Sequence, residues 1–300
     1  MRLTNGPIDF TDMAASADGS QIYALGTQAR AELVKYSAAT GAFQPFLGGI
    51  SATDVDVSRD GQWVTYVAYP EFTLWRSRID GSEKRQLTFP PMEAFLPRWS
   101  PDGTKIVFTD LQPGRKTRMH LMSREGGALE AVLPDDPFNQ IDPTWSPDGR
   151  SIVFARSHLD PDLAIFEVKL GTRELMKIPD SQARTSPRVS PDGRYIAALS
   201  RDWTKAFVFD RVKGSWTELA SAKGLGYPSW SHDSKTLFLR AVGHKVIGVN
   251  VESRQLQVIA TLDGFAEPAT SWTGVTAEDE ILLHHDRSTQ EIYRLTLKSE

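Results

Sequence analysis

The sequence of 300 residues contains no cysteine. This absence excludes disulfide bonds, thiol catalysis and cysteine metal sites, and it fits either redox compartment. No run of residues approaches the roughly 18 apolar positions that a membrane-spanning helix needs. There is no excess of positive charge either, since the formal net charge is −4. We therefore expect a protein that neither inserts into a membrane nor binds nucleic acid.

What the sequence does contain is an internal repeat. Its strong copies read Trp-Ser-Pro-Asp-Gly or Val-Ser-Pro-Asp-Gly, and the serine or its equivalent stands at positions 16, 58, 100, 146, 190, 231 and 273. The intervals between these anchors run from 41 to 46 residues. Such a period is typical of β-propellers, in which one repeat of about 40–50 residues builds one four-stranded blade.

The residues of each repeat support this interpretation. Ser-Pro-Asp-Gly suits a type I turn at each of its four positions. An apolar run such as Ile106–Phe108 follows the turn, as expected for a strand that is buried on both faces. The sequence therefore predicts an all-β protein, a seven-bladed propeller of four-stranded antiparallel blades. One such domain would occupy residues 1–300, although length alone suggests two domains.

The last repeat raises the question of how the ring closes. It offers strands over residues 280–284 and 291–297, but the sequence then ends without an outer strand. Residues 2–4 are similar to part of residues 85–88, which we expect to belong to an outer strand. We predict that residues 2–5 pair with residues 292–297 and so remove an exposed edge. The alternative is a truncated last blade on a six-bladed or open ring.

The repeat, with Ile-Val-Phe seven residues after the tryptophan, resembles the TolB-type, WD40-like (PD40) propeller repeat. The resemblance covers nearly the whole chain, and it implies a fold rather than a function. The chain also resembles the propeller half of bacterial multidomain sensor and regulator proteins, so we expect a module of a larger protein. Its location stays open: cytoplasmic if the chain is complete, periplasmic if it is the C-terminal domain of a membrane-anchored protein.

The function that we predict is non-catalytic. The chain lacks the Gly-x-Ser-x-Gly pentapeptide of an α/β-hydrolase, and no set of catalytic residues is evident. A monomeric propeller would recognise a protein, a peptide or a small ligand at its channel face, without a cofactor. The alternative is an enzyme with its site in the channel, such as a hydrolase or a metal-dependent polysaccharide lyase, because oligogalacturonate lyases resemble such propellers.

Candidate ligand-binding residues occur where the chain enters the inner strands. Asp12, Asp54 and Asp142 each stand three residues before the tryptophan position, and equivalent positions on a ring converge at the channel mouth. Three carboxylates there would suit a cation or an amine, whereas the alternative is that each aspartate only caps a turn. Arg184 and Tyr227 are predicted on the same face.

Three further sets of aromatic and histidine residues stand out in the sequence. Trp203 lies in a loop between strands and is a candidate anchor for a partner. A metal site could draw only on histidines near loops, and three ligands would have to meet at one ion; the candidates are His158, His244, His284 and His285. The alternative is that these histidines are simply solvated. The tryptophans that repeat at one position are predicted to pack between blades: Trp99, Trp145, Trp230 and Trp272.

Overall fold

The computed structural model describes residues 8–112, 114–157, 159–241, 245–265 and 272–295. These ranges contain 27 β-strands and no helix, hence no helix that could span a membrane. The strands form seven antiparallel sheets, of which six have four strands and one has three. The prediction of an all-β propeller with seven antiparallel sheets is therefore confirmed, and it departs from the structure in one sheet, which has three strands rather than the predicted four.

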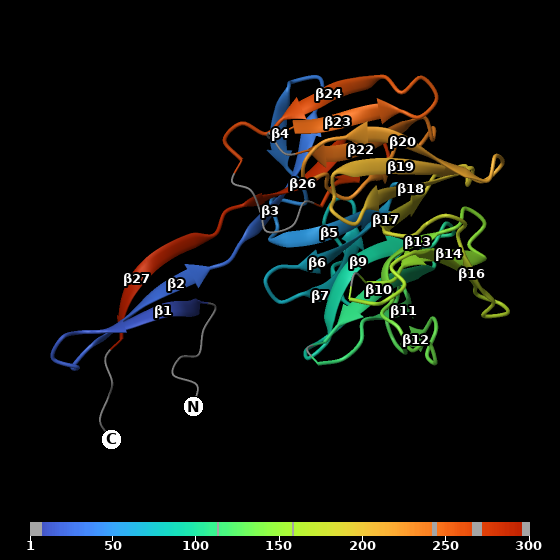
Figure 1. Ribbon diagram of the computed structural model, residues 1–300. Helices are drawn as coiled ribbons and strands as arrows, with labels where there is room; N and C mark the ends of the chain where they lie inside the picture. Colours follow the sequence, from blue (N-terminus) through green and yellow to red (C-terminus); the bar gives the residue numbers. More distant parts are fainter. Residues whose placement is uncertain (1–7, 113, 158, 242–244, 266–271, 296–300) are drawn as a thin grey trace.

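The six four-stranded sheets lie side by side as the blades of a disc (Figure 1). Five of them follow the order of the chain, from an inner to an outer strand. The first three of these are β5 (Ala52–Val57), β6 (Trp63–Ala68), β7 (Thr73–Arg78) and β8 (Arg85–Gln86); β9 (Glu93–Trp99), β10 (Lys105–Leu111), β11 (Arg118–Ser123) and β12 (Glu130–Ala131); and β13 (Ile141–Trp145), β14 (Ser151–Ala155), β15 (Ile165–Lys169) and β16 (Leu175–Lys177). The other two are β17 (Arg184–Val189), β18 (Tyr195–Ser200), β19 (Lys205–Asp210) and β20 (Ser215–Ser221); and β21 (Ser229–Trp230), β22 (Thr236–Ala241), β23 (Lys245–Asn250) and β24 (Leu256–Thr261).

Each repeated Ser-Pro-Asp-Gly segment joins an inner strand to the second strand of its sheet. The Ser100 hydroxyl donates to Asp102 at 2.6 Å and accepts the Lys105 N–H at 2.9 Å. The Gly103 N–H closes the turn on the Ser100 carbonyl, and Gly103 has a φ of 66°. A left-handed φ is easy for glycine because it has no Cβ, so the local sequence fixes this turn.

Apolar side chains fill the space between neighbouring blades. Phe108 and Phe154 are fully buried in two of these clusters. The repeated tryptophans lie there too, and the indole N–H of three of them reaches the previous inner strand: Trp99 donates to the Asp56 carbonyl at 3.2 Å, Trp145 to the Arg98 carbonyl at 3.1 Å and Trp230 to the Arg188 carbonyl at 2.9 Å. The predicted packing role of these tryptophans is confirmed.

The sixth blade of the disc combines both ends of the chain. Its strand order is β25 (Gly274–Val275), β26 (Ile281–Asp286), β3 (Ala31–Ser37) and β4 (Ala42–Pro45). The last repeat thus supplies the two inner strands and the first repeat the two outer ones. This composite blade packs on both neighbours, because one buried cluster joins it to β5 and β6 and another joins it to β22 and β23.

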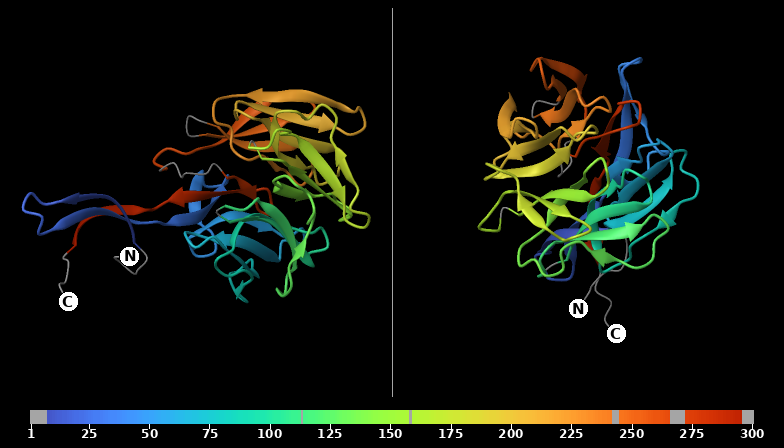
Figure 2. Two further views of the ribbon diagram at one scale, coloured as in Figure 1. Left: turned by 60° about the horizontal axis from the view of Figure 1, so that its bottom comes forward. Right: turned by 90° about the vertical axis from the view of Figure 1, so that its right-hand side faces the viewer.

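The remaining strands form a three-stranded sheet, β1 (Asp9–Ala15), β2 (Ile22–Gln28) and β27 (Thr289–Leu295), in the order β1-β2-β27. This sheet projects from the disc, as Figures 1 and 2 show. Strands β2 and β3 are separated by only two residues, as are β26 and β27. In the other repeats the second and third strands pair with each other, whereas here β2 pairs with β27 and β3 with β26.

This exchange of partners has a physical reason. Among the described residues the last repeat supplies only β25, β26 and β27, so a blade built from these strands alone would have three strands instead of four. The hairpin of β3 and β4 completes a four-stranded blade in the disc. The sheet with only three strands is then the projecting one. The predicted contact of residues 2–5 with residues 292–297 lies partly outside the described residues and stays a prediction.

Candidate functional site

A cavity of about 260 Å³ opens at the end of the inner strands where the Ser-Pro-Asp-Gly turns lie. We call it the turn-side cavity. Its wall includes residues from all six inner strands of the disc, β5, β9, β13, β17, β21 and β25. Three prolines of the repeated turns, Pro101, Pro147 and Pro191, contribute to the same wall.

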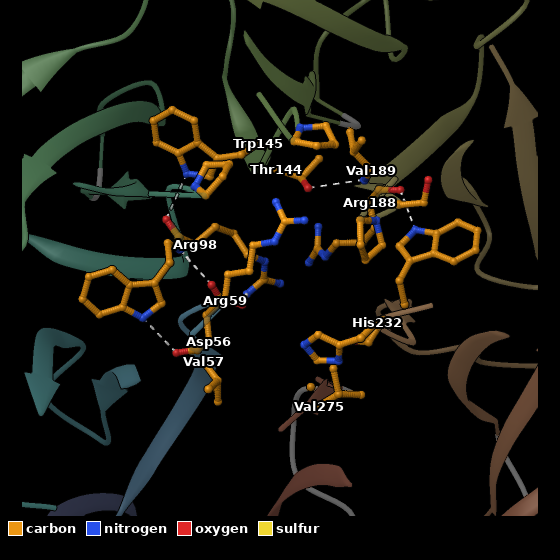
Figure 3. Close-up of a pocket in the computed structure, with 18 of the residues that line it drawn as sticks. Asp56, Val57, Arg59, Arg98, Thr144, Trp145, Arg188, Val189, His232 and Val275 are labelled. Atoms are coloured by element: carbon orange, nitrogen blue, oxygen red, sulfur yellow. Dashed lines mark hydrogen bonds and ion pairs between the residues drawn. The ribbon is translucent and has the colours of Figure 1, made fainter. Parts of the chain in front are cut away.

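The residue directly before the tryptophan position lines this cavity in five blades. It is charged in three of them, Asp56, Arg98 and Arg188, and neutral in the other two, Thr144 and Ser229. Arg98 and Arg188 extend from different blades toward the middle of the cavity (Figure 3). Two arginines repeated at one position of a ring thus bring two cations into one confined space.

Arg188 is held from one side only. Its Nη1 donates to Asp142 at 2.5 Å and to the Pro187 carbonyl at 2.6 Å. The side chain of Arg188 is 6% exposed and that of Asp142 is 2% exposed. Within the described ranges, Nε and Nη2 of Arg188 have no hydrogen-bond partner, and neither has Oδ2 of Asp142. A buried donor without a partner is costly, so this arginine can still accept an anion.

Arg98 faces a more distant carboxylate. Its Nη1 donates to the Pro97 carbonyl at 2.9 Å and lies 3.9 Å from Oδ1 of Asp56. Burial, and after it the nearby charge of Arg188, lower the pKa of Arg98 to about 10. Burial also raises the pKa of Asp56, although Asp56 accepts the Trp99 N–H at 2.8 Å.

Two more basic residues stand where the repeat departs from Ser-Pro-Asp-Gly. Arg59 and His232 occupy the proline position of their turns, and both line the turn-side cavity (Figure 3). His232 Nδ1 lies 2.7 Å from Asp279. Arg59 is exposed and has no hydrogen bond or ion pair within the part of the chain that the structure describes. It is therefore the cation at this mouth that a ligand could engage at least cost.

A second cavity of about 320 Å³ lies toward the opposite end of the inner strands. We call it the loop-side cavity. Three of the predicted site residues line it: Asp142, Trp203 and Tyr227. The rings of Trp203 and Tyr227 meet edge to face, with their centroids 5.4 Å apart. Burial raises the pKa of Tyr227, which is half-buried. Trp203 is also half-buried and packs within its own molecule.

The three predicted aspartates share one backbone conformation. Asp12, Asp54 and Asp142 have φ values of 48°, 49° and 57°, each at a β-bulge of its inner strand. Aspartate tolerates this left-handed region better than most residues do, so the backbone by itself favours aspartate here. Asp54 and Asp142 come close enough for the charge of Asp142 to raise the pKa of Asp54.

Asp54 is a buried carboxylate of the channel with a raised pKa. Burial raises its pKa to about 6. The Leu96 N–H, which donates to Asp54 at 3.3 Å, acts in the opposite direction and lowers the pKa. Asp12 does not join this pair, because it is exposed on β1 of the projecting sheet. Arg184 also lies elsewhere, with its guanidinium over the rings of Phe207 and Trp216, 4.6 Å from each centroid.

The candidate metal ligands are not gathered at one point. His158 and His244 lie outside the described residues. His284 and His285 are neighbours on β26, so they point to opposite faces of that sheet. His284 stacks on Trp272 and His285 on Phe265. Over the described ranges, no three histidine or acidic side chains are arranged to hold a metal ion.

Four basic residues of the channel were not predicted from the sequence: Arg59, Arg98, Arg188 and His232. The signal was present in the repeat itself. Arg98 and Arg188 occupy the same position of two copies, and Arg59 and His232 replace a proline that other copies keep. The rule that located Asp54 and Asp142, that equivalent positions converge on the axis of a ring, applies equally to these residues.

The fold and the channel together define a β-propeller whose central cavities are lined by charged residues. The sequence matches the TolB beta propeller domain family (PD40) over residues 2–275. The chain belongs to that family.

Individual relatives are more distant. An uncharacterized protein of Agrobacterium fabrum is 31% identical over 86 residues, a match that spans 26% of this chain and 29% of that protein. A putative TolB from Agrobacterium tumefaciens has a similar structure, with a TM-score of 0.69 and 17% identity over 86% of this chain and 98% of that one. An oligogalacturonate lyase in complex with manganese gives a TM-score of 0.56 at 16% identity, covering 84% of this chain and 80% of that one. At these identities the structural likeness establishes the fold alone.

Proposed function

We propose that this chain is a non-catalytic binding propeller that takes a short segment of a protein partner into its turn-side cavity. The observation that carries the proposal is the opening of the turn-side cavity. Side chains from all six inner strands surround it, and Nε and Nη2 of Arg188 have no hydrogen-bond partner among the described residues. The sequence analysis placed the binding face at the loop end instead. The turn end is the better choice because the two aromatic candidates of the loop end, Trp203 and Tyr227, already contact each other.

The size of the cavity supports a chain segment rather than a folded domain. Its volume of about 260 Å³ is below the ~300–1,000 Å³ of typical small-molecule pockets. The end or a short extended stretch of a peptide fits such a space, while the rest of the partner would rest on the turns around it. A module of this kind would serve within a larger protein, and it needs no cofactor.

The proposal is tested by selecting peptides that bind the protein and then measuring their affinity for variants in which one of the two cavities is filled by a tryptophan. Peptides are selected from a random display library on the wild-type protein, and their affinities are then measured by isothermal titration calorimetry. Val57→Trp and Val275→Trp each place a large side chain at the turn-side cavity, and Leu111→Trp does the same at the loop-side cavity. We expect both turn-side variants to weaken the selected peptides at least ~10-fold, which is about 1.4 kcal/mol.

The control is Leu111→Trp, which should leave these affinities unchanged. Circular dichroism and the melting temperature establish that each variant is folded. Peptides that ignore both turn-side variants but lose affinity with Leu111→Trp would overturn the choice of mouth. A selection that yields no peptide dependent on either cavity would overturn the proposed function.

The second candidate is a metal-dependent polysaccharide lyase, which the fold likeness to an oligogalacturonate lyase favours. Its test is the appearance of unsaturated uronate products when the purified protein is supplied with polygalacturonate and manganese. Turnover that disappears with a chelator and returns with the metal would replace the binding proposal with this one.

A further inference from the structure

We propose that the turn-side cavity is an anion site, in which Arg188, Arg98 and Arg59 hold a carboxylate of the peptide ligand. This inference rests on the proposed function and names the chemical group that the cavity recognises. Three features support it: the convergence of the three arginines, the free donors of Arg188 and the charge balance of the cavity.

The first feature is convergence. Arg59 comes from the turn after β5, Arg98 from β9 and Arg188 from β17, so three separate blades contribute. Figure 3 shows the three side chains extending toward the middle of the cavity. Like charges repel, so their approach is unfavourable until an anion lies between them. The lowered pKa of Arg98, caused by burial and then by the charge of Arg188, agrees with this strain.

The second feature is the set of free donors. Asp142 and the Pro187 carbonyl occupy only Nη1 of Arg188. Its Nε and Nη2 are buried and lack a partner among the described residues. These two nitrogens form the side of a guanidinium that binds a carboxylate through two parallel hydrogen bonds. The side chain that supplies them is 6% exposed and lines the cavity, so a ligand oxygen there would satisfy donors that water reaches poorly.

The third feature is the charge balance. Asp142 is engaged by Arg188 from the far side, and Asp56 already accepts the Trp99 N–H. Asp54, whose pKa burial raises to about 6, is not among the residues that line either cavity. Among the described residues on the wall of the turn-side cavity, Asp56 is the sole carboxylate, and it faces three arginines and His232. His232 is paired with Asp279, so the excess positive charge lies on the arginines.

The test uses three short peptides that differ only in the carboxylate they carry. Binding is followed by the fluorescence of the tryptophans in the cavity wall, Trp99, Trp145 and Trp230. The first peptide has a free C-terminal carboxylate, the second a C-terminal amide, and the third an amide end with one internal aspartate. We expect at least one carboxylate peptide to bind ~10-fold more tightly than the neutral amide, the size expected for one charge-assisted pair. The better of the two identifies the carboxylate as terminal or internal.

Variants then locate the site. Arg188→Gln should remove the ~10-fold preference for the carboxylate, and Arg188→Lys should restore it only in part, because lysine keeps the charge but loses the paired donors. Arg59→Gln, in an exposed turn without ion pairs within the described ranges, should reduce the preference ~3-fold with no effect on folding. The matched control is Arg184→Gln on the same strand as Arg188, since its guanidinium lies over Phe207 and Trp216 outside the cavity.

Each outcome decides the inference. A carboxylate preference that depends on Arg188 and Arg59 but not on Arg184 supports it. Equal binding of the carboxylate and amide peptides overturns it, as does an equal loss with Arg184→Gln. Tighter binding of inorganic phosphate than of any carboxylate overturns the assignment to a carboxylate.

The two proposals can fail separately. Peptides that bind at the turn-side mouth without regard to charge would retain the proposed function and remove the anion site. Acetate that quenches the cavity tryptophans through Arg188, with no peptide bound by any variant, would retain the anion site and remove the proposed function.

Discussion

The disc and the projecting three-stranded sheet contain the same local motif but differ in what surrounds it. In the disc, the Ser100 turn leads into strands buried between two neighbouring blades. In the projecting sheet, the Ser16 turn has the same hydrogen bonds, with Ser16 donating to Asp18 at 2.5 Å and accepting the Gln21 N–H at 3.0 Å. Yet nearly every residue of β1 is exposed. A turn therefore forms from its own residues, whereas a core requires neighbouring sheets.

The exposure of apolar side chains differs between the disc and the projecting sheet in the same way. Phe108 and Phe154 are fully buried in the disc, while Met13 and Ile292 of the projecting sheet are 59% and 78% exposed. The aromatic contact of that sheet joins Phe10 to Tyr293, with centroids 5.4 Å apart. We infer that most of the stability of the molecule resides in the disc.

The largest expected difference comes from truncating side chains in the two regions. Phe108→Ala leaves a cavity in the disc, so the free energy of unfolding should fall by ~3–5 kcal/mol. Ile292→Ala, on the exposed sheet, should change it by less than ~0.5 kcal/mol. Urea unfolding followed by tryptophan fluorescence measures both. A loss for Ile292→Ala as large as that for Phe108→Ala would break the comparison, because it would mean that the sheet is buried against something.

The next effect is on the pH dependence of stability. Burial raises the pKa of Asp54 in the disc to about 6, from an ordinary value of 3.8. The folded state thus keeps a proton that the unfolded state releases, and the free energy of unfolding should fall as the pH rises from about 4 to 6, by at most ~3 kcal/mol. Asp54→Asn should flatten this part of the profile in urea unfolding at a series of pH values.

The matched control lies in the projecting sheet. The Ser16 hydroxyl and the Ser20 N–H lower the pKa of Asp18 to about 2. The sign is opposite, since its turn loses support only as the pH falls from about 4 toward 2. Asp18→Asn should therefore leave the profile between pH 4 and 6 unchanged, and a flattened profile there would contradict the assignment of this pH dependence to Asp54.

The smallest effect compares the two turns. Ser100→Ala removes two hydrogen bonds of a buried serine, with an expected cost of ~1–2 kcal/mol for the unfolding of the disc. Ser16→Ala removes the equivalent bonds in the projecting sheet, and the same measurement should change by less than ~0.5 kcal/mol. Equal costs would contradict the view that the sheet opens independently of the disc.

Part of the candidate site was predictable in the same way as the fold. The shared repeat position led to Asp54 and Asp142, which do lie close together. Asp12 has the same position and the same left-handed backbone, yet it lies on the projecting sheet. Its repeat predicts the conformation of the residue correctly, but it cannot predict which strand β2 will pair with.

The basic residues show the other limit. The repeat could have placed Arg98 and Arg188 on the channel axis. It could not have predicted that Nε and Nη2 of Arg188 lack a partner within the described residues. Their availability depends on Asp142, which stands 46 residues earlier in the chain and takes only Nη1. The packing of Trp203 on Tyr227, and of Arg184 over Phe207 and Trp216, likewise joins residues from separate strands and loops.

The sequence by itself determined the turns, the strands and the number of repeats, because Ser-Pro-Asp-Gly and the apolar runs act over a few neighbouring residues. Only the tertiary structure decided that the first and last repeats exchange strands, since unpaired strand edges favour whichever arrangement completes the blades of the disc. It also decided which cations stay available in the channel. Charge interactions depend on distances between blades, and those distances are set by how the blades pack on one another rather than by the order of the residues.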